Sequence, residues 1–394
     1  TEAGEILPAE DLEDAVWLFV EGLETVTERN KPSYPNRKLG DTFLVPAVCA
    51  ICKGKVYLWN ALTGQYIKVN NIAQDYLTRE DGTFYGRDDF HTVTILDTVI
   101  VTNKQIVTKI QEPSTPAPVE DSQGTIRVNQ VVGGETYGAY LNDVPFEFVT
   151  ENTTSIDDIL EGLAALITAG GYTTNVYKTS LEINSTSTFT LVVGDSVNNT
   201  LMNSYQDGCL NIAQLAKPSK PGRNVTILNT NASEDDYYLQ FSEDKGDWEE
   251  SLKPGLSPGL DASTMPHRLF YRYDEYDQDF GWFFEECPFE DRLVGDDDSN
   301  PHPSFIDKPI KSAYFFNNRM GLLSFENVNM SRDKEVFNFY GETQLAVLDT
   351  DNVDLSAAST RPVDLFDVLV QQQGIILFGN RQQFFLSSPD NGVI

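Results

Sequence analysis

Apolar and polar residues repeat in a hairpin pattern along much of this chain. Four apolar segments, at residues 56–60, 99–104, 315–319 and 376–381, each contain an asparagine at their end, followed by a polar turn and a second apolar pair. Asparagine suits such a corner because it tolerates left-handed backbone angles and its side chain can cap the turn. Residues 237–241, a turn at Gly246 and Trp248 form a further candidate hairpin. Repeated antiparallel hairpins predict a mainly β fold with a β-propeller-like core.

A segment of different character lies between two proline-bearing stretches, residues 111–121 and 216–222. Ser155 is placed to cap a helix whose apolar residues follow helical spacing from Ile156 to Ile167, and Gly170 ends it. Strands are predicted around this helix, at 126–129, 139–149, around 176, at 181–183 and at 189–193. The pattern predicts an inserted α+β domain of the ββαββ type.

The chain therefore divides into three predicted domains and two linkers. Residues 1–110 form an N-terminal β region with one helix, and residues 122–215 form the inserted, platform-like domain. Residues 223–394 supply further propeller strands that are expected to continue beyond the chain end. The stretches 111–121 and 216–222 are the proline-rich linkers.

Two apolar patterns near the N-terminus lead to opposite predictions. A helix is predicted where apolar residues share one helical face, namely Leu12, Ala15, Val16, Phe19, Leu23 and Val26. The apolar run at 43–52 predicts a buried strand, although it contains Cys49 and Cys52 in a CxxC arrangement. A zinc site needs two more ligands, and the sequence has no second CxxC and no close histidine pair. We therefore expect these cysteines to be structural and buried.

The charge balance narrows the range of partners. Sixty acidic residues face 28 basic ones, for a formal net charge of -32. Such a field repels DNA phosphates and anionic membranes, so nucleic-acid capture is not expected. No apolar stretch approaches the 18 residues of a membrane span.

The acids cluster in two stretches, 234–250 and 272–298. One reading is that they form solvated loops. The other is that they line a channel, where like charge keeps DNA from sticking as it slides. The candidate lumen-facing residues are Asp244, Asp247, Asp274, Asp277 and Asp279.

Catalytic and metal chemistry find little support in the sequence. The three histidines fall in no HExxH or GxSxG pattern, and no phosphate-binding glycine motif occurs. Three carboxylates at 296–298 are a conceivable cation site, but the surrounding asparagine and prolines favour an exposed rigid loop. The EF-hand-like run at 349–354 lacks the required glycine and the final glutamate. We predict no catalytic residues, no metal and no cofactor.

The most distinctive motif begins at Gly295. The chain resembles tail tubular protein B, the tail nozzle of podoviruses, which carries a GDxDTNPxPSF loop, an FFxNRLGFLSGEN strand pair and a Phe-Asn-Phe-Tyr segment. The corresponding segments here lie at 295–305, 315–327 and 337–340. Phe325 replaces the family's usual glycine, and residues 1–40 do not match. The residues that carry the signature are Gly295, Asp296, Asp298, Asn300, Pro301, Pro303, Ser304, Phe305, Asn318, Arg319, Glu326 and Asn327.

The resemblance implies a structural, non-enzymatic subunit of a tail tube that conducts phage DNA into the host without sequence-specific binding. It further implies a hexamer with β-propeller cores, an adaptor ring and tail fibres as partners, and a place in the virion tail after assembly in the host cytoplasm. Family members are about twice as long, so we expect the true N-terminus and the second half to lie outside this chain. The alternatives are a β-propeller tail protein that binds or depolymerises glycans, and a salt-adapted binding module whose acidity serves solubility.

Overall fold

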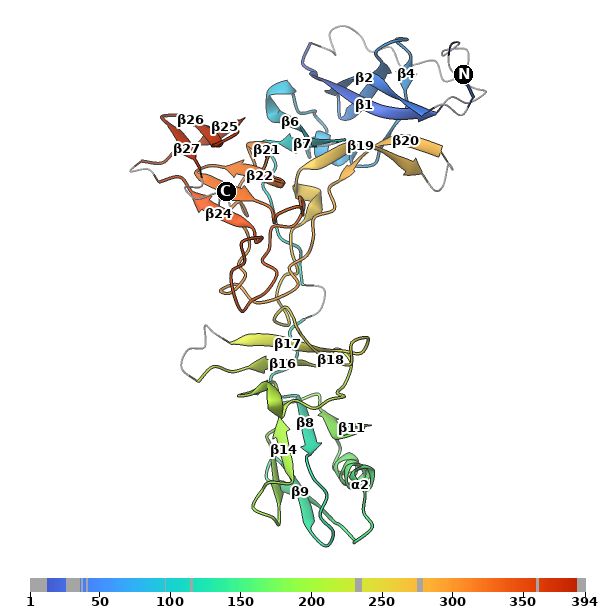
Figure 1. The fold of residues 1–394 in the computed structure, drawn as a ribbon, viewed down its shortest axis with the longest axis vertical. Coiled ribbons are helices and arrows are strands. Elements are labelled where there is room, and N and C mark those ends of the chain that lie inside the picture. The colour runs from blue at the N-terminus through green and yellow to red at the C-terminus, as the bar shows by residue number, and fades with distance from the viewer. Residues whose placement is uncertain are drawn as a thin grey trace.

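The computed structural model of this chain describes residues 13–25, 36, 38–39, 42–95, 97–113, 116–230, 236–274, 279–358 and 361–387. Figure 1 shows a T-shaped molecule in which a broad upper part sits on a long, narrow lower part. We call residues 116–251 the stalk and the remaining described residues the body.

The N-terminal part of the body contains two sheets. The first has the order β1-β2-β3-β4, built from β1 (Val16–Thr25), β2 (Thr42–Cys52), β3 (Lys55–Asn60) and β4 (Tyr66–Ile67). The second has the order β5-β20-β19-β7-β6, built from β5 (Val69–Asn71), β6 (Phe90–Ile95), β7 (Thr98–Asn103), β19 (His267–Asp274) and β20 (Asp279–Glu286). Strands from before and after the stalk segment thus share one sheet, and the apolar faces of the two sheets form one core between them.

The C-terminal part of the body contains two more sheets, which lie on the opposite arm of the T (Figure 1). One is built in order from β21 (Ser312–Phe316), β22 (Arg319–Ser324), β23 (Asn327–Met330) and β24 (Val353–Ser356). The other is built in order from β25 (Leu365–Gln371), β26 (Gly374–Gly379) and β27 (Gln383–Leu386). Both are simple antiparallel meanders.

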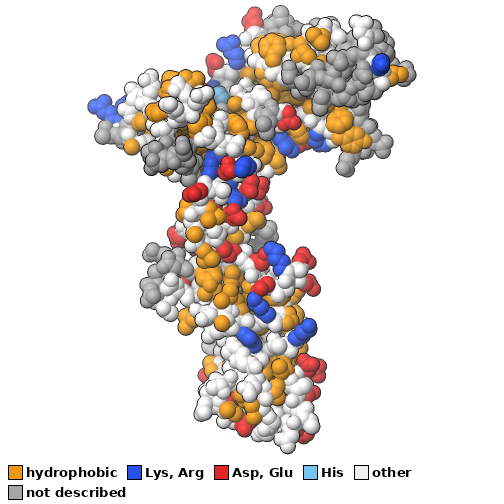
Figure 2. Space-filling model, in the orientation of Figure 1, with side chains coloured by type: hydrophobic (Ala, Val, Ile, Leu, Met, Phe, Trp, Pro, Cys, Tyr) orange, Lys and Arg blue, Asp and Glu red, His pale blue; other side chains and the backbone are white. Residues whose placement is uncertain are grey.

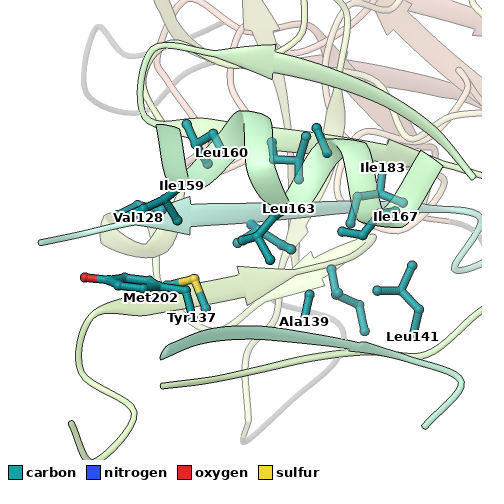
Figure 3. Packing of buried hydrophobic residues seen from close by; sticks show 14 of the residues in the cluster. Val128, Tyr137, Ala139, Leu141, Ile159, Leu160, Leu163, Ile167, Ile183 and Met202 are labelled. Atoms are coloured by element: carbon teal, nitrogen blue, oxygen red, sulfur yellow. The ribbon is translucent and has the colours of Figure 1, made fainter. Parts of the chain in front are cut away.

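The far end of the stalk is a small α+β unit. It has one sheet in the order β10-β9-β13, from β9 (Thr136–Leu141), β10 (Val144–Val149) and β13 (Leu191–Asp195). Its other sheet has the order β11-β12-β8-β14, from β8 (Gln123–Val128), β11 (Thr173–Tyr177), β12 (Ser180–Asn184) and β14 (Met202–Tyr205). The helix α2 (Ile156–Ala169) packs on these strands, and its buried side chains meet residues of both sheets (Figure 3).

The helix forms where the sequence predicts it, for local reasons. Ser155 accepts a hydrogen bond from the backbone of Asp158, whose carboxylate bonds back to the Ser155 amide at 2.7 Å. This reciprocal capping box satisfies two amides that the first turn leaves free. The apolar face, including Ile159, Leu163 and Ile167, is fully buried, which supplies the tertiary energy that a 14-residue helix needs.

A third stalk sheet connects this unit to the body. It has the order β15-β16-β17-β18, from β15 (Gly208–Cys209), β16 (Asn224–Ile227), β17 (Tyr237–Ser242) and β18 (Asp247–Glu250). The predicted linker at 216–222 therefore falls between two strands of one sheet, and that sheet lies in the stalk (Figure 1). Short 3₁₀ turns occur at Gln74–Leu77, Arg87–Asp89, Ile212–Gln214 and Ala262–Thr264.

The predicted N-terminal helix is wrong in its described part, which is the strand β1; Leu12 and Val26 lie outside the described residues. All ten residues of β1 pair with β2 in antiparallel register. Val20 is buried in the core between the sheets, whereas Phe19 on the opposite face is 77% exposed. The apolar residues of this segment fit the two-residue repeat of a strand as well as helical spacing. Pairing with the long strand β2 stabilises the strand.

The hairpin predictions are confirmed in most places. The strand pairs β3–β4, β21–β22, β26–β27 and β17–β18 form as expected. Asn60 caps its own turn through the amides of Leu62 and Thr63, and Asn318 has a left-handed φ of 61°. The hairpin expected after Asn103 is wrong, because β7 pairs backward with β6 instead.

One further expectation needs correction. The single strand predicted at 139–149 is a hairpin, β9–β10, which turns at Asn142 and Asp143 with positive φ at both residues. The fold is mainly β, as predicted, and among the described residues none of its sheets closes on itself.

The four cysteines are buried and form no disulfide bond. Burial raises the pKa of the Cys49 thiol, with a smaller contribution from Cys52, which keeps it protonated and unreactive. Within the described part of the chain, no helix has the length and apolar character that crossing a membrane requires.

Candidate functional site: the signature loop

The signature loop, residues 295–305, begins where the body meets the stalk. The amide of Gly295 donates to the carbonyl of Ser251 at 3.1 Å, and the Lys253 amide returns a bond to the Gly295 carbonyl at 2.9 Å. Gly295 has a φ of +84°, and a Cβ there would lie 2.7 Å from Ser299 Oγ. The position therefore requires glycine for both backbone and space.

Asp296 organises the first turn of this loop and also reaches the stalk. Its Oδ1 accepts from the amides of Asp298 at 3.1 Å and Ser299 at 3.0 Å. Its Oδ2 accepts from the hydroxyl of Tyr238 in β17 at 2.8 Å. One carboxylate thus holds the loop and contacts the stalk sheet, while the Asp298 side chain is exposed.

Asn300 ties the loop to the body. Its Oδ1 accepts from the Gly341 amide at 2.9 Å, and its Nδ2 donates to the Val294 carbonyl at 3.0 Å. The neighbouring Arg292 has a fully buried side chain that donates to Asp297, to the Asn300 carbonyl and to the Ser257 carbonyl. These bonds hold the loop against the segments on either side of it.

The end of the loop enters the body core. Phe305 is fully buried and meets the ring of Phe339 edge-on, with centroids 5.6 Å apart. Ser304 donates its amide to Asp354 at 2.7 Å. Pro303 is buried and Pro301 is exposed, so the two prolines stiffen a segment that runs from the surface into the core.

Asn318 and Arg319 form the β21–β22 corner. Arg319 is buried and donates to the carbonyls of Ser331 at 2.7 Å, Asp351 at 2.5 Å and Asp349 at 2.9 Å. Burial lowers the pKa of its guanidinium, which nearby acids partly offset. Its role is therefore to satisfy the carbonyls of the 349–351 segment.

Glu326 and Asn327 stand at the β22–β23 corner. The Asn327 amide donates to the Ser304 carbonyl at 3.0 Å and its oxygen accepts from Ser356 at 2.8 Å. The Glu326 side chain is exposed. The preceding Phe325 has a φ of +50°, which explains why a glycine would suit this position.

The structure thus brings most of the signature residues into one hydrogen-bonded framework rather than into a pocket. Within the described part of the chain, no group of three or more His, Cys, Asp or Glu side chains is arranged to hold a metal ion. His267 serves packing: burial lowers its pKa to about 4, and its ring stacks on Tyr76. This arrangement suits a structural role.

The acids predicted to face a lumen have different environments. Asp244 is exposed at the β17–β18 turn. Asp247 forms an ion pair with Lys217. Asp274 is the last residue of β19 and pairs with Asp279, the first residue of β20. Asp277 lies outside the described residues. On the visible face, acidic and basic side chains are interspersed along the molecule (Figure 2).

Sequence reasoning missed the partners of the signature loop. Tyr238 and Glu250 of the stalk both form hydrogen bonds with Gln344 of the body. Arg292 is buried beneath the loop. Arg292 stands three positions before the loop in an acidic stretch, and this isolated basic residue is the sequence signal that indicates a buried partner for the loop.

Comparison with known proteins agrees with this structural role. A family model described as bacteriophage nozzle protein matches residues 46–393. Tail tubular protein gp12 of Escherichia phage T7 is 26% identical over 321 residues, which cover 77% of this chain and 40% of that protein. The chain therefore spans about two fifths of the length of this curated relative.

Proposed function

Because this chain belongs to the bacteriophage nozzle protein family, we propose that it forms part of the wall of a phage tail tube through which DNA is ejected. The family match over residues 46–393 is the observation that carries this proposal. The family and the T7 relative are structural tail proteins, which confirms the predicted resemblance and the non-enzymatic role.

The assembly that we propose is a ring of six copies around a central channel, placed in the virion tail after assembly in the host cytoplasm. An adaptor ring and tail fibres are its proposed partners. The meander sheets β21–β24 and β25–β27 have the strand order of propeller blades, and we propose that the full-length protein completes a propeller from such sheets. The unit at 122–215 is the proposed platform that contacts the adaptor.

The proposed contribution of charge is to let DNA pass without binding. A protein that neutralises several phosphates holds DNA strongly, whereas a net charge of -32 opposes such contacts. Asp244, exposed at a turn, is the described side chain best placed for this role among the proposed lumen-facing acids. DNA is thus a passenger in transit and not a specific ligand.

Electron microscopy of the full-length protein tests this function. We expect negatively stained rings with an opening wide enough for duplex DNA, alone or after addition of the adaptor protein. A protein that stays monomeric even with the adaptor would overturn the proposal. Release of sugars from host surface glycans would instead support the depolymerase alternative, which the family membership does not favour.

A further inference from the structure

The stalk and the body have separate hydrophobic cores. Within the described residues, the two clusters of the stalk draw on residues between 126 and 248 only. The clusters of the body draw on residues outside that range. The junction therefore lacks the shared apolar core that usually fixes two units against each other.

Two chain segments connect the units. They leave the body side by side, since Ile110 and Leu260 form an antiparallel bridge and the Gln111 amide donates to the Gly259 carbonyl at 2.9 Å. Nearer the stalk, the second segment is tied to the body by a bridge at Gly295, whose amide donates to the Ser251 carbonyl and whose carbonyl accepts from the Lys253 amide. The connection is thus a ribbon whose second segment is bonded to the body at Lys253, Pro258 and Gly259, so that any swing of the stalk starts at its edge, at Ser251.

Polar side chains hold the stalk sheet at this junction. Gln344 of the body accepts from the Tyr238 amide at 3.1 Å and donates to the Tyr238 carbonyl at 2.9 Å. Glu250 of the stalk accepts from the Thr343 hydroxyl at 2.8 Å and from the Gln344 amide at 2.9 Å. Together with the Tyr238–Asp296 hydrogen bond, these contacts attach both β17 and β18 to the body.

The polar atoms of these groups can exchange their partners for water, and of the five side chains only that of Tyr238 is buried. Asp296 keeps its bonds to Asp298 and Ser299 through Oδ1 when Oδ2 loses Tyr238. The signature loop would therefore remain folded after release. Hydrogen bonds of this kind have a small net free energy because water replaces them, whereas separating a shared apolar core would expose apolar surface.

We propose that Tyr238, Glu250, Thr343, Gln344 and Asp296 form a releasable latch that sets the angle between stalk and body. The structure holds the closed state. Opening the latch lets the stalk swing on the ribbon while both units stay folded. This property of the chain holds whether or not it lines a tail tube.

Pulsed electron paramagnetic resonance on the 394-residue chain tests the latch. Spin labels at D88C in the body and E161C on α2 report the angle, since both side chains are exposed and all four natural cysteines are buried. Labelled chain is diluted into unlabelled chain, so that only distances within one molecule are read. Wild type should give one narrow distance distribution, and Y238F/Q344A should broaden it at least twofold.

Tyr237→Phe is the matched control, because it removes the neighbouring hydroxyl of the same strand. It should leave the distribution unchanged. If the double variant fails to fold by circular dichroism, Tyr238→Phe alone carries the test, since it keeps every backbone bond. An unchanged distribution in the folded variants would overturn the latch, and so would a wild-type distribution as broad as that of Y238F/Q344A. Ring formation, scored separately by microscopy, decides the proposed function and not the latch.

Discussion

Arg292 and Asp297 form an ion pair in which the cation is buried and the acid faces solvent. Arg292 Nη1 lies 2.8 Å from Asp297 Oδ1, and the two side chains are 0% and 64% exposed. The same guanidinium donates to the carbonyls of Asn300 and Ser257. The buried charge is therefore satisfied mainly by backbone oxygens, with the carboxylate at its outer end.

This asymmetry predicts unequal effects of the two substitutions. Arg292→Met should lower the free energy of unfolding by about 3 kcal/mol, because it leaves buried carbonyls without donors. Asp297→Asn should cost about 1 kcal/mol, since solvent screens the exposed acid. Urea denaturation of both variants measures the difference. Equal losses would mean that the ion pair, and not the carbonyl contacts, holds the loop.

Gly162 in α2 should not tolerate alanine. The exchange gains about 1 kcal/mol of helix propensity, but the new Cβ would lie 2.3 Å from the Phe148 ring. Overpacking typically costs about 1–3 kcal/mol, so we expect G162A to lower the thermal midpoint. Adding F148L should recover part of the loss, and purely additive effects would show that the two sites do not touch.

We predict that the left-handed backbone angle of Phe325 lowers the stability of the fold. A left-handed φ costs a residue with a Cβ about 1–2 kcal/mol, and glycine avoids that cost. We expect F325G to match the stability of wild type within about 1 kcal/mol despite the loss of a partly buried ring. The control F325V should be clearly less stable, because a β-branched residue fits this angle poorly. The reverse order in urea midpoints would contradict the strain.

Glu182 in β12 and Arg223, just before β16, form a buried pair in the stalk, with Oε1 and Nε 3.2 Å apart. Burial raises the pKa of Glu182, although Arg223 opposes the shift. The folded state then binds the proton more tightly than the unfolded chain, so the associated stability is present at low pH and lost as pH rises through the folded pKa. The stability of wild type relative to E182Q should therefore fall from pH 5 to pH 7.5. A pH-independent difference in urea unfolding would contradict the shift.

The exposed turn at Asp244 offers a test of the lumen assignment in assembled particles. Asp244→Lys adds a phosphate-binding charge and should slow genome ejection, more at low salt than at high salt. Asp88→Lys makes the same charge change at an exposed site of the body and should leave ejection unchanged. Equal rates for both variants and wild type would remove Asp244 from the channel wall.

The sequence by itself determined the parts that depend on local chemistry. The helix α2 follows from the Ser155 cap and the apolar face down to Ile167, and most hairpins follow from asparagine corners such as Asn318. The burial of Cys49 and Cys52 followed from an unbroken apolar strand. The family resemblance likewise rests on a contiguous motif from Gly295 onward.

Tertiary structure alone decided what depends on distant partners. Residues 16–25 satisfy both helical and strand periodicity, and pairing with β2 selects the strand. Asp296 could be read as a cation ligand or a solvated acid, but Tyr238, 58 positions away in sequence, makes it a contact between stalk and body. Local patterns set which elements form. Long-range hydrogen bonds and burial set where they lie, because those energies exist only once the chain has folded.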